Sequence, residues 1–463
     1  MGITFTAYLG LTWILRLIAP LVSLICAAPP GSGAAKLARG IKERSEAHRR
    51  LAAWGRGRAR GDRELPLVWM HAPSAGEAQQ ARAVIARLRE LRPETQVVFT
   101  YFSPSARGFA SEVGADFSDC LPWDLPWVLR PAVRALAPDL AVFTKTEVWP
   151  TLARELARAG TPTALVAGTV SAGSRRLGFL ARRLLGPAWG GLSLCCAVDE
   201  VSARRLRALG VTAEVRVTGD PGTEAAVGRV RSGAGTRLTA LPDRPVLVAG
   251  STWPADEKVL LPAIREVRRS VPELLLVLAP HEPSESRLHG ITRRLGDRRT
   301  WTTFAEIEFG RSSFDRLEAP PDQIGTVLVE RVGALAALYG LAADADGPGL
   351  AFVGGGFGRR GLHSVIEPAA AGCPVIFGPR HERAPAARKL IELGAGFTVA
   401  DPGELVAAVL RLLASESRRA GARKAGLGFA HEELGAAKRT AELLSGFLDS
   451  GSKAQYHTHC SHT

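Results

Sequence analysis

Glycines and cationic side chains alternate in the stretch from Gly354 to His363. Gly355 and Gly356 allow backbone amides to approach a ligand without interference from a Cβ atom. Arg359 and His363 add fixed and switchable positive charge to the same loop. These residue types at this spacing predict an anion-binding loop.

Ser364 and Glu367 follow this loop with the Ser-x-x-Glu spacing of a helix capping box. The start of such a helix has a dipole that favours an anion. A glycine-rich turn closed by a capped helix explains the same residues without any ligand. Both interpretations place a helix start directly after the loop.

The segment from His71 to Glu77 has the same spacing at Ser74 and Glu77, and it follows an apolar run. A carboxylate at a helix start on the edge of a cleft could take a proton from a sugar or lipid hydroxyl. The helix dipole weakens such a base, unless burial in a closed cleft offsets the effect. A capping box alone also accounts for both residues.

Two further polar groups follow predicted strands. Lys145 and Glu147 could form a pair that positions a polar substrate, or a surface salt bridge beside a core Trp149. Ser251 and Thr252 precede a predicted helix, where hydroxyls and free amides suit a phosphate or carboxylate. Ordinary helix capping explains this second pair equally well.

The elements that must position these residues alternate between short apolar runs and amphipathic runs, which is typical of parallel sheets wrapped by helices. We predict two Rossmann-like halves joined by a linker at 227–244, with their strand-to-helix loops facing a common cleft. The predicted strands are 67–70, 96–100, 140–143, 163–167, 192–198 and 215–218, then 246–249, 274–279, 327–329, 350–353, 375–377 and 396–399. Residues 298–323 are predicted to be an irregular surface insertion.

The chain of 463 residues carries a formal net charge of +14, which indicates an anionic partner. The apolar run at 4–27 predicts a membrane anchor helix, either spanning or interfacial, because it is about long enough to cross a bilayer. Residues 36–63 hold ten Lys and Arg against three acidic residues, so they predict contact with an anionic membrane surface and a cytoplasmic location for the rest. This placement and the absence of a known motif argue against nucleic acid as a partner.

The motifs HAPSAGE at 71–77, TEVWP at 146–150, VTGD at 217–220, AGSTWPADE at 249–257 and the run from Gly354 to Pro379 occur in this order behind the predicted anchor. As an ordered set they resemble the 3-deoxy-D-manno-octulosonic acid (Kdo) transferases over nearly the whole chain. The resemblance implies an α/β fold of GT-B type and an inverting, metal-independent glycosyltransferase without a cofactor. It further implies transfer of Kdo from the donor CMP-Kdo to a lipid A precursor at the cytoplasmic face of the inner membrane, as part of lipopolysaccharide core biosynthesis.

Residue roles follow from this resemblance. Glu77 matches the proposed general base and Glu147 a second catalytic acidic residue. The predicted acceptor-binding residues are Ser74, Gly76 and Lys145, and the predicted nucleotide-sugar-binding residues are Ser251, Thr252, His281, Gly355, Gly356, Arg359, His363, Ser364 and Glu367. His281 stands where the family usually has Arg, and Ser364 where it has Asn. A lipid glycosyltransferase using a UDP-sugar, or a membrane-tethered binding protein without catalysis, remains an alternative.

The predicted domain order begins with the anchor at 1–27 and a basic juxtamembrane linker at 28–64. An acceptor-binding domain at 65–230 and a nucleotide-sugar-binding domain at 231–445 follow. The last segment, 446–463, is predicted to be a flexible tail, since chain ends are seldom ordered unless they are tied down.

Overall fold

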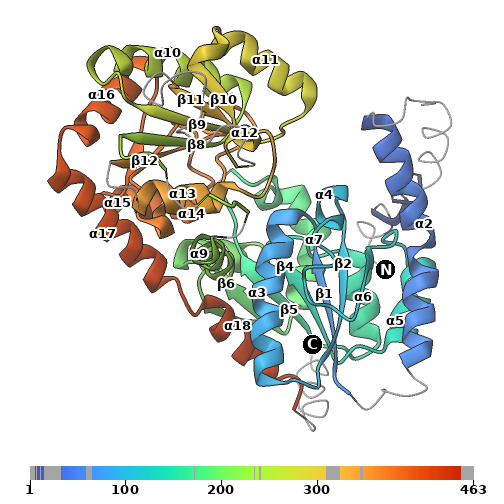
Figure 1. Cartoon of the computed structure of the whole chain (residues 1–463). Helices are drawn as coiled ribbons and strands as arrows, with labels where there is room; N and C mark the ends of the chain where they lie inside the picture. The colour runs from blue at the N-terminus through green and yellow to red at the C-terminus, as the bar shows by residue number, and fades with distance from the viewer. Residues whose placement is uncertain are drawn as a thin grey trace. The chain divides into compact units, whose positions relative to one another are not determined.

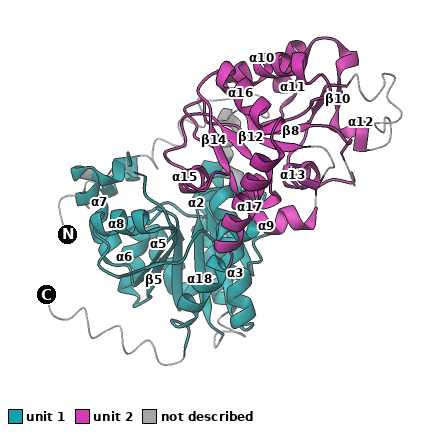
Figure 2. Ribbon diagram, turned by 90° about the vertical axis from the view of Figure 1, so that its left-hand side faces the viewer, with its two compact units in different colours: residues 1–225, 435–463 teal, residues 226–434 magenta. Residues whose placement is uncertain are grey.

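The computed structural model describes residues 6, 8–10, 12–14, 33–58, 65–171, 173–233, 235–238, 241–308, 324–344 and 348–449. The chain divides into two compact units, residues 1–225 with 435–463 and residues 226–434 (Figure 2). Each unit contains one seven-stranded parallel sheet with helices. The prediction of a two-domain α/β fold is therefore confirmed.

The sheet of the first unit has the strand order β3-β2-β1-β4-β5-β6-β7 (Figure 1). Chain connections run outward in both directions from the neighbouring strands β1 and β4. The bounds in this unit are α2 (Gly33–Arg58), β1 (Leu67–Ala72), α3 (Ala75–Leu91), β2 (Gln96–Tyr101), α4 (Pro104–Arg107), β3 (Phe117–Cys120), α5 (Pro126–Leu136), β4 (Leu140–Thr144), α6 (Pro150–Arg158), β5 (Thr163–Gly168), a 3₁₀ turn (Arg175–Leu177), α7 (Phe179–Gly190), β6 (Leu194–Ala197), α8 (Glu200–Ala208), β7 (Glu214–Val217) and α18 (Ala436–Ser445).

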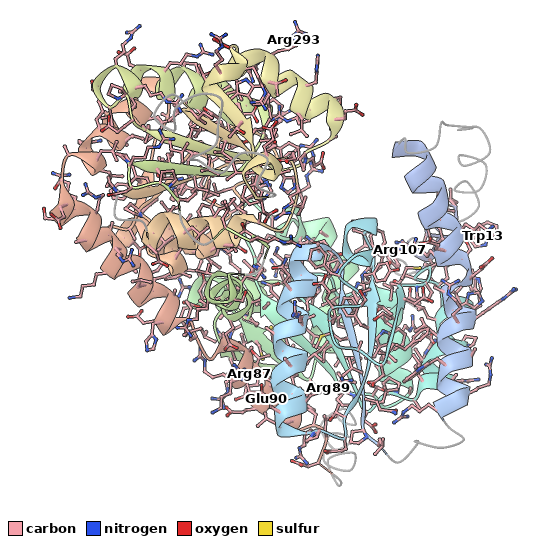
Figure 3. All side chains as sticks on the ribbon, in the orientation of Figure 1. Trp13, Arg87, Arg89, Glu90, Arg107 and Arg293 are labelled. Carbon is pink, nitrogen blue, oxygen red and sulfur yellow. The ribbon has the colours of Figure 1, made fainter. Side chains whose placement is uncertain are left out.

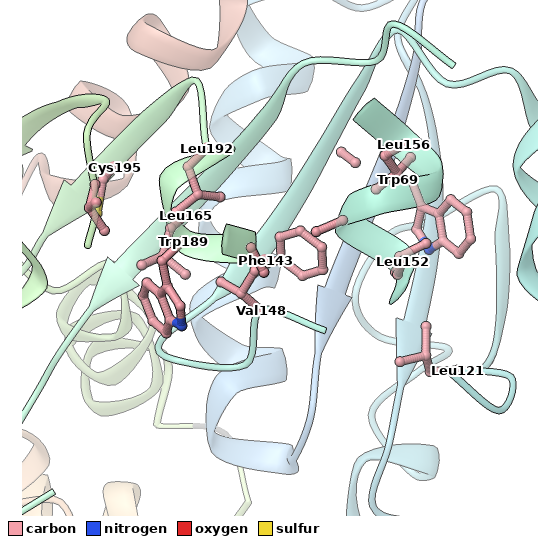
Figure 4. Packing of buried hydrophobic residues seen from close by; sticks show 14 of the residues in the cluster. Trp69, Leu121, Phe143, Val148, Leu152, Leu156, Leu165, Trp189, Leu192 and Cys195 are labelled. Carbon is pink, nitrogen blue, oxygen red and sulfur yellow. The ribbon is translucent and has the colours of Figure 1, made fainter. Parts of the chain in front are cut away.

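Helices cover both faces of this sheet, so its central strands are buried on both sides and are apolar almost throughout. In β1, Leu67 and Trp69 pack toward α5 and α6, while Val68 and Met70 pack toward α3 and α18. Figure 4 shows the first of these cores, in which Phe143 of β4 lies among side chains of β5 and α6. The alternation places α3 and α6, which follow β1 and β4, on opposite faces.

Three segments differ from the predicted domain organisation. Most of the predicted basic linker forms α2, which packs on α5 because Leu51 is buried in the core that contains Leu129 and Val133 of α5. The predicted linker at 227–244 begins inside a helix, α9 (Gly222–Ser232). Helix α18, assigned by sequence to the second domain, packs on α3 in the first unit and contributes Ala441 to its core.

The sheet of the second unit has the order β10-β11-β9-β8-β12-β13-β14. Connections diverge here from β8 and β12. The bounds are β8 (Val246–Thr252), α10 (Pro254–Ser270), β9 (Leu275–Pro280), α11 (Glu285–Leu295), a 3₁₀ turn (Arg298–Thr300), β10 (Trp301–Thr303), α12 (Phe304–Glu308), β11 (Thr326–Leu328), α13 (Leu335–Asp344), β12 (Gly349–Val353), α14 (Ile366–Ala371), β13 (Val375–Phe377), α15 (Pro385–Glu392), β14 (Gly396–Thr398), α16 (Pro402–Leu413) and α17 (Glu416–Glu432).

Every predicted strand is present, but two strands were not predicted. These are β3, which pairs with β2 at one edge of the first sheet, and β10, which pairs with β11 at one edge of the second. The prediction of an irregular insertion at 298–323 is wrong for its first part, because residues 298–308 form regular structure ending in α12. Its remainder, 309–323, lies outside the described residues.

Most of the predicted anchor at 1–27 also lies outside the described residues, as does the tail from residue 450 onward. Tyr8, one of the described residues near the start, donates a 2.6 Å hydrogen bond to Oδ2 of Asp124. Across the described residues, none of the helices has both the length and the apolar character that a membrane crossing requires.

Candidate functional site

The loops after β1 and β4 form the first candidate site. Because α3 and α6 leave these adjacent strands toward opposite faces, this is the topological switch point at which open parallel sheets bind ligands. The loop after β1 leads into α3 at Ala75, and the loop after β4 begins at Lys145. Side chains from these two loops meet.

Glu77 lies at the centre of this meeting. Its Oε1 atom is 2.7 Å from Nζ of Lys145, and its Oε2 atom accepts a hydrogen bond from the hydroxyl of Ser74. The Glu77 side chain is 11% exposed and that of Lys145 is 44% exposed. The structure therefore joins three predicted site residues around one nearly buried carboxylate.

The predicted capping box at Ser74 is wrong, because the Ser74 side chain makes no hydrogen bond to the backbone of α3. Its hydroxyl is directed to the Glu77 carboxylate instead. Gly76 lies between them, and a Cβ atom built at Gly76 would have no heavy atom within 4 Å. Space is therefore open beside the helix start.

Glu147 does not join this group. It forms an ion pair with Arg176 of the 3₁₀ turn, and both side chains are about one-third exposed. The predicted pairing of Lys145 with Glu147 is wrong. The turn after β4 directs the two side chains to different partners.

His71, at the end of β1, supports this site from beneath. Its Nε2 atom accepts a 3.0 Å hydrogen bond from the indole of Trp149, so the ring proton is on Nδ1, which lies 3.1 Å from Oγ1 of Thr100. Burial lowers the pKa of His71 to about 3. The imidazole is therefore neutral and holds Trp149 in place. No role was predicted for His71 from the sequence.

The loops after β8 and β12 form the second candidate site, at the switch point of the other sheet. The glycines there are required by close backbone approach. A Cβ atom at Gly354 would lie 2.3 Å from the carbonyl oxygen of Ser251, and one at Gly356 would lie 2.6 Å from the amide nitrogen of Gly378. Gly355 has a φ of +95°.

Asp256 in the first turn of α10 ties this loop to the helix. It is fully buried, and it accepts hydrogen bonds from the backbone amides of Trp253 and Gly355, both at 2.8 Å, and of Phe357, at 3.2 Å. In the sequence Asp256 is one residue of the motif AGSTWPADE at 249–257, with no role predicted for it. Its link to the glycine loop spans 99 residues, so no local signal could have revealed it.

Ser251 and Thr252 differ in what they offer to a ligand. Thr252 is buried, and its hydroxyl donates to Oε1 of Glu257 at 3.0 Å. Burial raises the pKa of Glu257, while its pairing with Arg287 opposes that shift. Ser251 is half-buried with a φ of +54°.

His281 and His363 stack on each other with ring centroids 4.1 Å apart. The indole of Trp253 donates a 2.9 Å hydrogen bond to Nε2 of His363, and the guanidinium carbon of Arg360 lies 4.1 Å from the Trp253 ring centroid. Burial lowers the pKa of His363 to about 4 and also lowers the pKa of His281. The positive charge at this stack therefore comes from Arg360. Arg359 and Arg360 are both exposed.

The predicted capping box at Ser364 and Glu367 is also wrong. Helix α14 has Val365 at its N-cap position, and the Ser364 hydroxyl accepts only a long 3.4 Å hydrogen bond from Ile366. Glu367 instead pairs with Arg229 of α9 at 2.7 Å. Ser364 is exposed, so its hydroxyl is accessible, whereas Glu367 is engaged within the unit.

Among the described residues there is no group of three or more His, Cys, Asp or Glu side chains that could hold a metal ion.

Known proteins are similar to this chain in sequence. A sequence model of the family described as 3-deoxy-D-manno-octulosonic-acid transferase (kdotransferase) matches residues 41–222. The 3-deoxy-D-manno-octulosonic acid transferase of Chlamydophila psittaci is 30% identical over 83% of this chain and 86% of its own length. The chain belongs to the Kdo transferase family. The corresponding transferase of Bordetella pertussis is 30% identical over 86% of this Kdo transferase chain and 91% of its own length. This membership makes the protein a glycosyltransferase.

Solved structures are similar in fold to this Kdo transferase. A UDP-GlcNAc 2-epimerase from Neisseria meningitidis covers 82% of the chain with a TM-score of 0.57 and 14% identity. The calicheamicin glycosyltransferase CalG4 covers 84% with a TM-score of 0.50 and 15% identity. At these identities the likeness extends to the two-domain α/β architecture alone.

Proposed function

We propose that this chain is an inverting, metal-independent glycosyltransferase of GT-B architecture that transfers Kdo from CMP-Kdo to a lipid A precursor. Membership of the Kdo transferase family supports the sugar and the reaction class. The observation that carries the mechanism is the position of Glu77, a nearly buried carboxylate at the ligand-binding edge of the first sheet. The first unit then binds the acceptor and the second binds the nucleotide sugar.

In the proposed reaction Glu77 is the general base. An acceptor hydroxyl attacks the anomeric carbon of Kdo, the bond from that carbon to the phosphate oxygen of CMP breaks, and Glu77 takes the hydroxyl proton. A positioned base of this kind contributes typically about 10²–10⁴-fold to the rate. The carboxylate retains open lone pairs for this proton, because it has about four acceptor sites and the described contacts use two.

The second unit is suited to the departing nucleotide. Arg359 and Arg360 offer fixed positive charge next to a loop in which Asp256 holds two backbone amides. Preorganised cationic groups stabilise the charge that develops on a leaving phosphate. The two amides already donate to Asp256, so their contribution is to hold the loop that carries the arginines. No step of this proposal requires a cofactor or a metal ion.

The proposed location is the cytoplasmic face of the inner membrane. Its support comes from the apolar run at 4–27 and the excess of Lys and Arg between residues 36 and 63. Helix α2 carries most of that basic run and packs on α5 within the first unit. The basic residues that would contact the anionic membrane surface thus belong to the proposed acceptor-binding unit.

The test is incubation of the purified full-length chain with CMP-Kdo and lipid IVA. We expect release of CMP and a lipid product heavier by the mass of whole Kdo units in mass spectrometry. A folded sample that binds CMP in a thermal-shift assay without turnover would favour a binding protein. Stabilisation by UDP and not by CMP would replace the donor in this proposal.

A further inference from the structure

Lys145 is the only cationic partner that the described contacts give to Glu77. The pair joins the loop after β4 to the first turn of α3, and the two residues are 68 positions apart in the sequence. The carboxylate is nearly buried, whereas the lysine side chain reaches it from a half-exposed position. An approaching acceptor therefore meets the lysine and the carboxylate together.

The backbone at Lys145 is unusual. Its φ is +63°, in the left-handed region that a residue with a Cβ atom rarely adopts, and its amide donates a 2.8 Å hydrogen bond to the carbonyl of Val166. Strain of this kind persists where the surrounding structure over-determines it, and it concentrates at functional sites. Glycine would adopt this conformation more readily, so the position retains lysine despite a conformational cost.

We propose that Lys145 is the positioning residue that holds the Glu77 carboxylate in its reactive orientation, with Ser74 fixing the second oxygen. The inference rests on the proposed role of Glu77 as the base. It replaces the role in acceptor binding that the sequence suggested for Lys145. A charge-assisted hydrogen bond is short and directional, so it restricts the rotamer of the glutamate more strongly than solvent would.

The two roles of Lys145 give opposite kinetic signatures. A residue that orients the base acts on the chemical step, so its removal lowers kcat and leaves KM nearly unchanged. A residue that binds an anionic group of the acceptor contributes uniform binding, so its removal raises KM and leaves kcat nearly unchanged. The split between kcat and KM therefore decides the role.

The experiment compares Lys145→Met, Lys145→Arg and Lys145→Gly in the full-length chain, with CMP-Kdo and lipid IVA as substrates. We expect Lys145→Met to lower kcat about 10–100-fold, with the acceptor KM within about twofold of wild type. Lys145→Arg should recover most of the rate, because it restores a cation. Lys145→Gly should lose as much kcat as Lys145→Met while unfolding at a denaturant concentration no lower than wild type, because the left-handed backbone suits glycine.

The matched control is Lys438→Met. Lys438 also faces a glutamate in the first unit, Glu442 at 3.9 Å, but on the exposed face of α18. We expect this variant to keep both kcat and KM. Equal loss of rate in this control would assign the effect to general charge removal and overturn the inference.

A double variant separates this inference from the proposed function. If Lys145 acts through Glu77, Lys145→Met should cause no further loss of rate in a Glu77→Gln background. A further loss there, an increased acceptor KM with normal kcat, or a fully active Lys145→Met variant would each overturn the positioning role while the proposed function stands. An inactive wild-type chain would overturn both.

Discussion

The loops after β1 and β4 in the first unit carry charged side chains, whereas those after β8 and β12 in the second unit carry glycines, a buried aspartate and stacked rings. At the first switch point Glu77, Lys145 and Ser74 interact through their side chains. At the second, Asp256 binds backbone amides of the glycine loop. One sheet edge thus offers a nearly buried carboxylate and the other offers a rigid backbone surface.

Both switch points nevertheless contain the same Trp–His hydrogen bond. In each unit a tryptophan indole donates a hydrogen bond to Nε2 of a histidine, from Trp149 to His71 and from Trp253 to His363. Burial keeps both histidines neutral by lowering their pKa values. The same Trp–His hydrogen bond therefore supports different functional groups in the two units, so substitutions at the first edge should reduce catalysis and those at the second should reduce stability.

The largest expected effect is on catalysis in the first unit. Glu77→Gln should lower kcat by about 10²–10⁴-fold, because the amide cannot take the acceptor proton. Stability in urea should change little by comparison. The control is Glu90→Gln on the same helix, where Glu90 is exposed and pairs with Arg87 (Figure 3); normal turnover is expected there. An unchanged rate in Glu77→Gln would remove Glu77 from the base role.

The corresponding change in the second unit should affect packing first. Gly356→Ala brings a Cβ atom within 2.6 Å of the backbone at Gly378, so we expect a loss of about 1–3 kcal/mol in the free energy of unfolding. Gly358→Ala is the matched control, because its nearest backbone neighbour would lie 4.0 Å away. Urea denaturation of both variants measures the difference. Equal stability would contradict close backbone contact at Gly356.

The lowered pKa values of His71 and His363 predict that the free energy of unfolding depends on pH. Their folded pKa values lie below the unfolded value of about 6.5, so acid favours the unfolded state from about pH 6.5 downward. For His363, with a pKa of about 4, the loss at pH 5 relative to pH 7 amounts to about 2 kcal/mol.

His363→Gln keeps an acceptor for the indole and cannot titrate. Its free energy of unfolding should therefore fall less than that of wild type between pH 7 and pH 5. Denaturant titrations at the two pH values measure this. His71→Gln is the parallel variant in the first unit, where the pKa is about 3. The same change in the free energy of unfolding with pH in wild type, His363→Gln and His71→Gln would contradict the lowered pKa values of these histidines.

The smallest expected effect concerns the start of α14. Ser364→Ala should change the free energy of unfolding by less than about 0.5 kcal/mol, because this exposed hydroxyl makes only a 3.4 Å contact. Asp401→Ala should cost about 1 kcal/mol, since Asp401 caps α16 through a 2.9 Å bond to the amide of Glu404. Thermal or urea denaturation compares the two. A loss of unfolding free energy in Ser364→Ala as large as that in Asp401→Ala would indicate that Ser364 caps α14 after all.

The sequence predicted well what depends on local pattern. Apolar runs located all the strands that are buried on both faces, and the Ser-x-x-Glu spacing at Ser74 located the start of α3. The strands β3 and β10 were missed because polar residues interrupt both short segments, Phe117–Cys120 and Trp301–Thr303.

Contacts between distant residues could not be predicted in this way. Lys145 was assigned to Glu147 because the two are close in sequence, but adjacent strands carry Lys145 to Glu77. Both capping boxes had the right spacing, yet the carboxylates found other partners, Lys145 for Glu77 and Arg229 for Glu367. Spacing identifies which groups are available, and the tertiary structure decides which groups meet.

Helix α18 belongs to the first unit but follows the whole second unit in the sequence. Glu224, at the exit from the first unit, accepts a 2.6 Å hydrogen bond from the amide of Gly435, where the chain returns. Residues 226–434 are therefore an insertion whose ends lie together. During synthesis the second unit has all of its residues while the first still lacks the helix that covers α3. The unit that begins the chain is consequently the last to close its core.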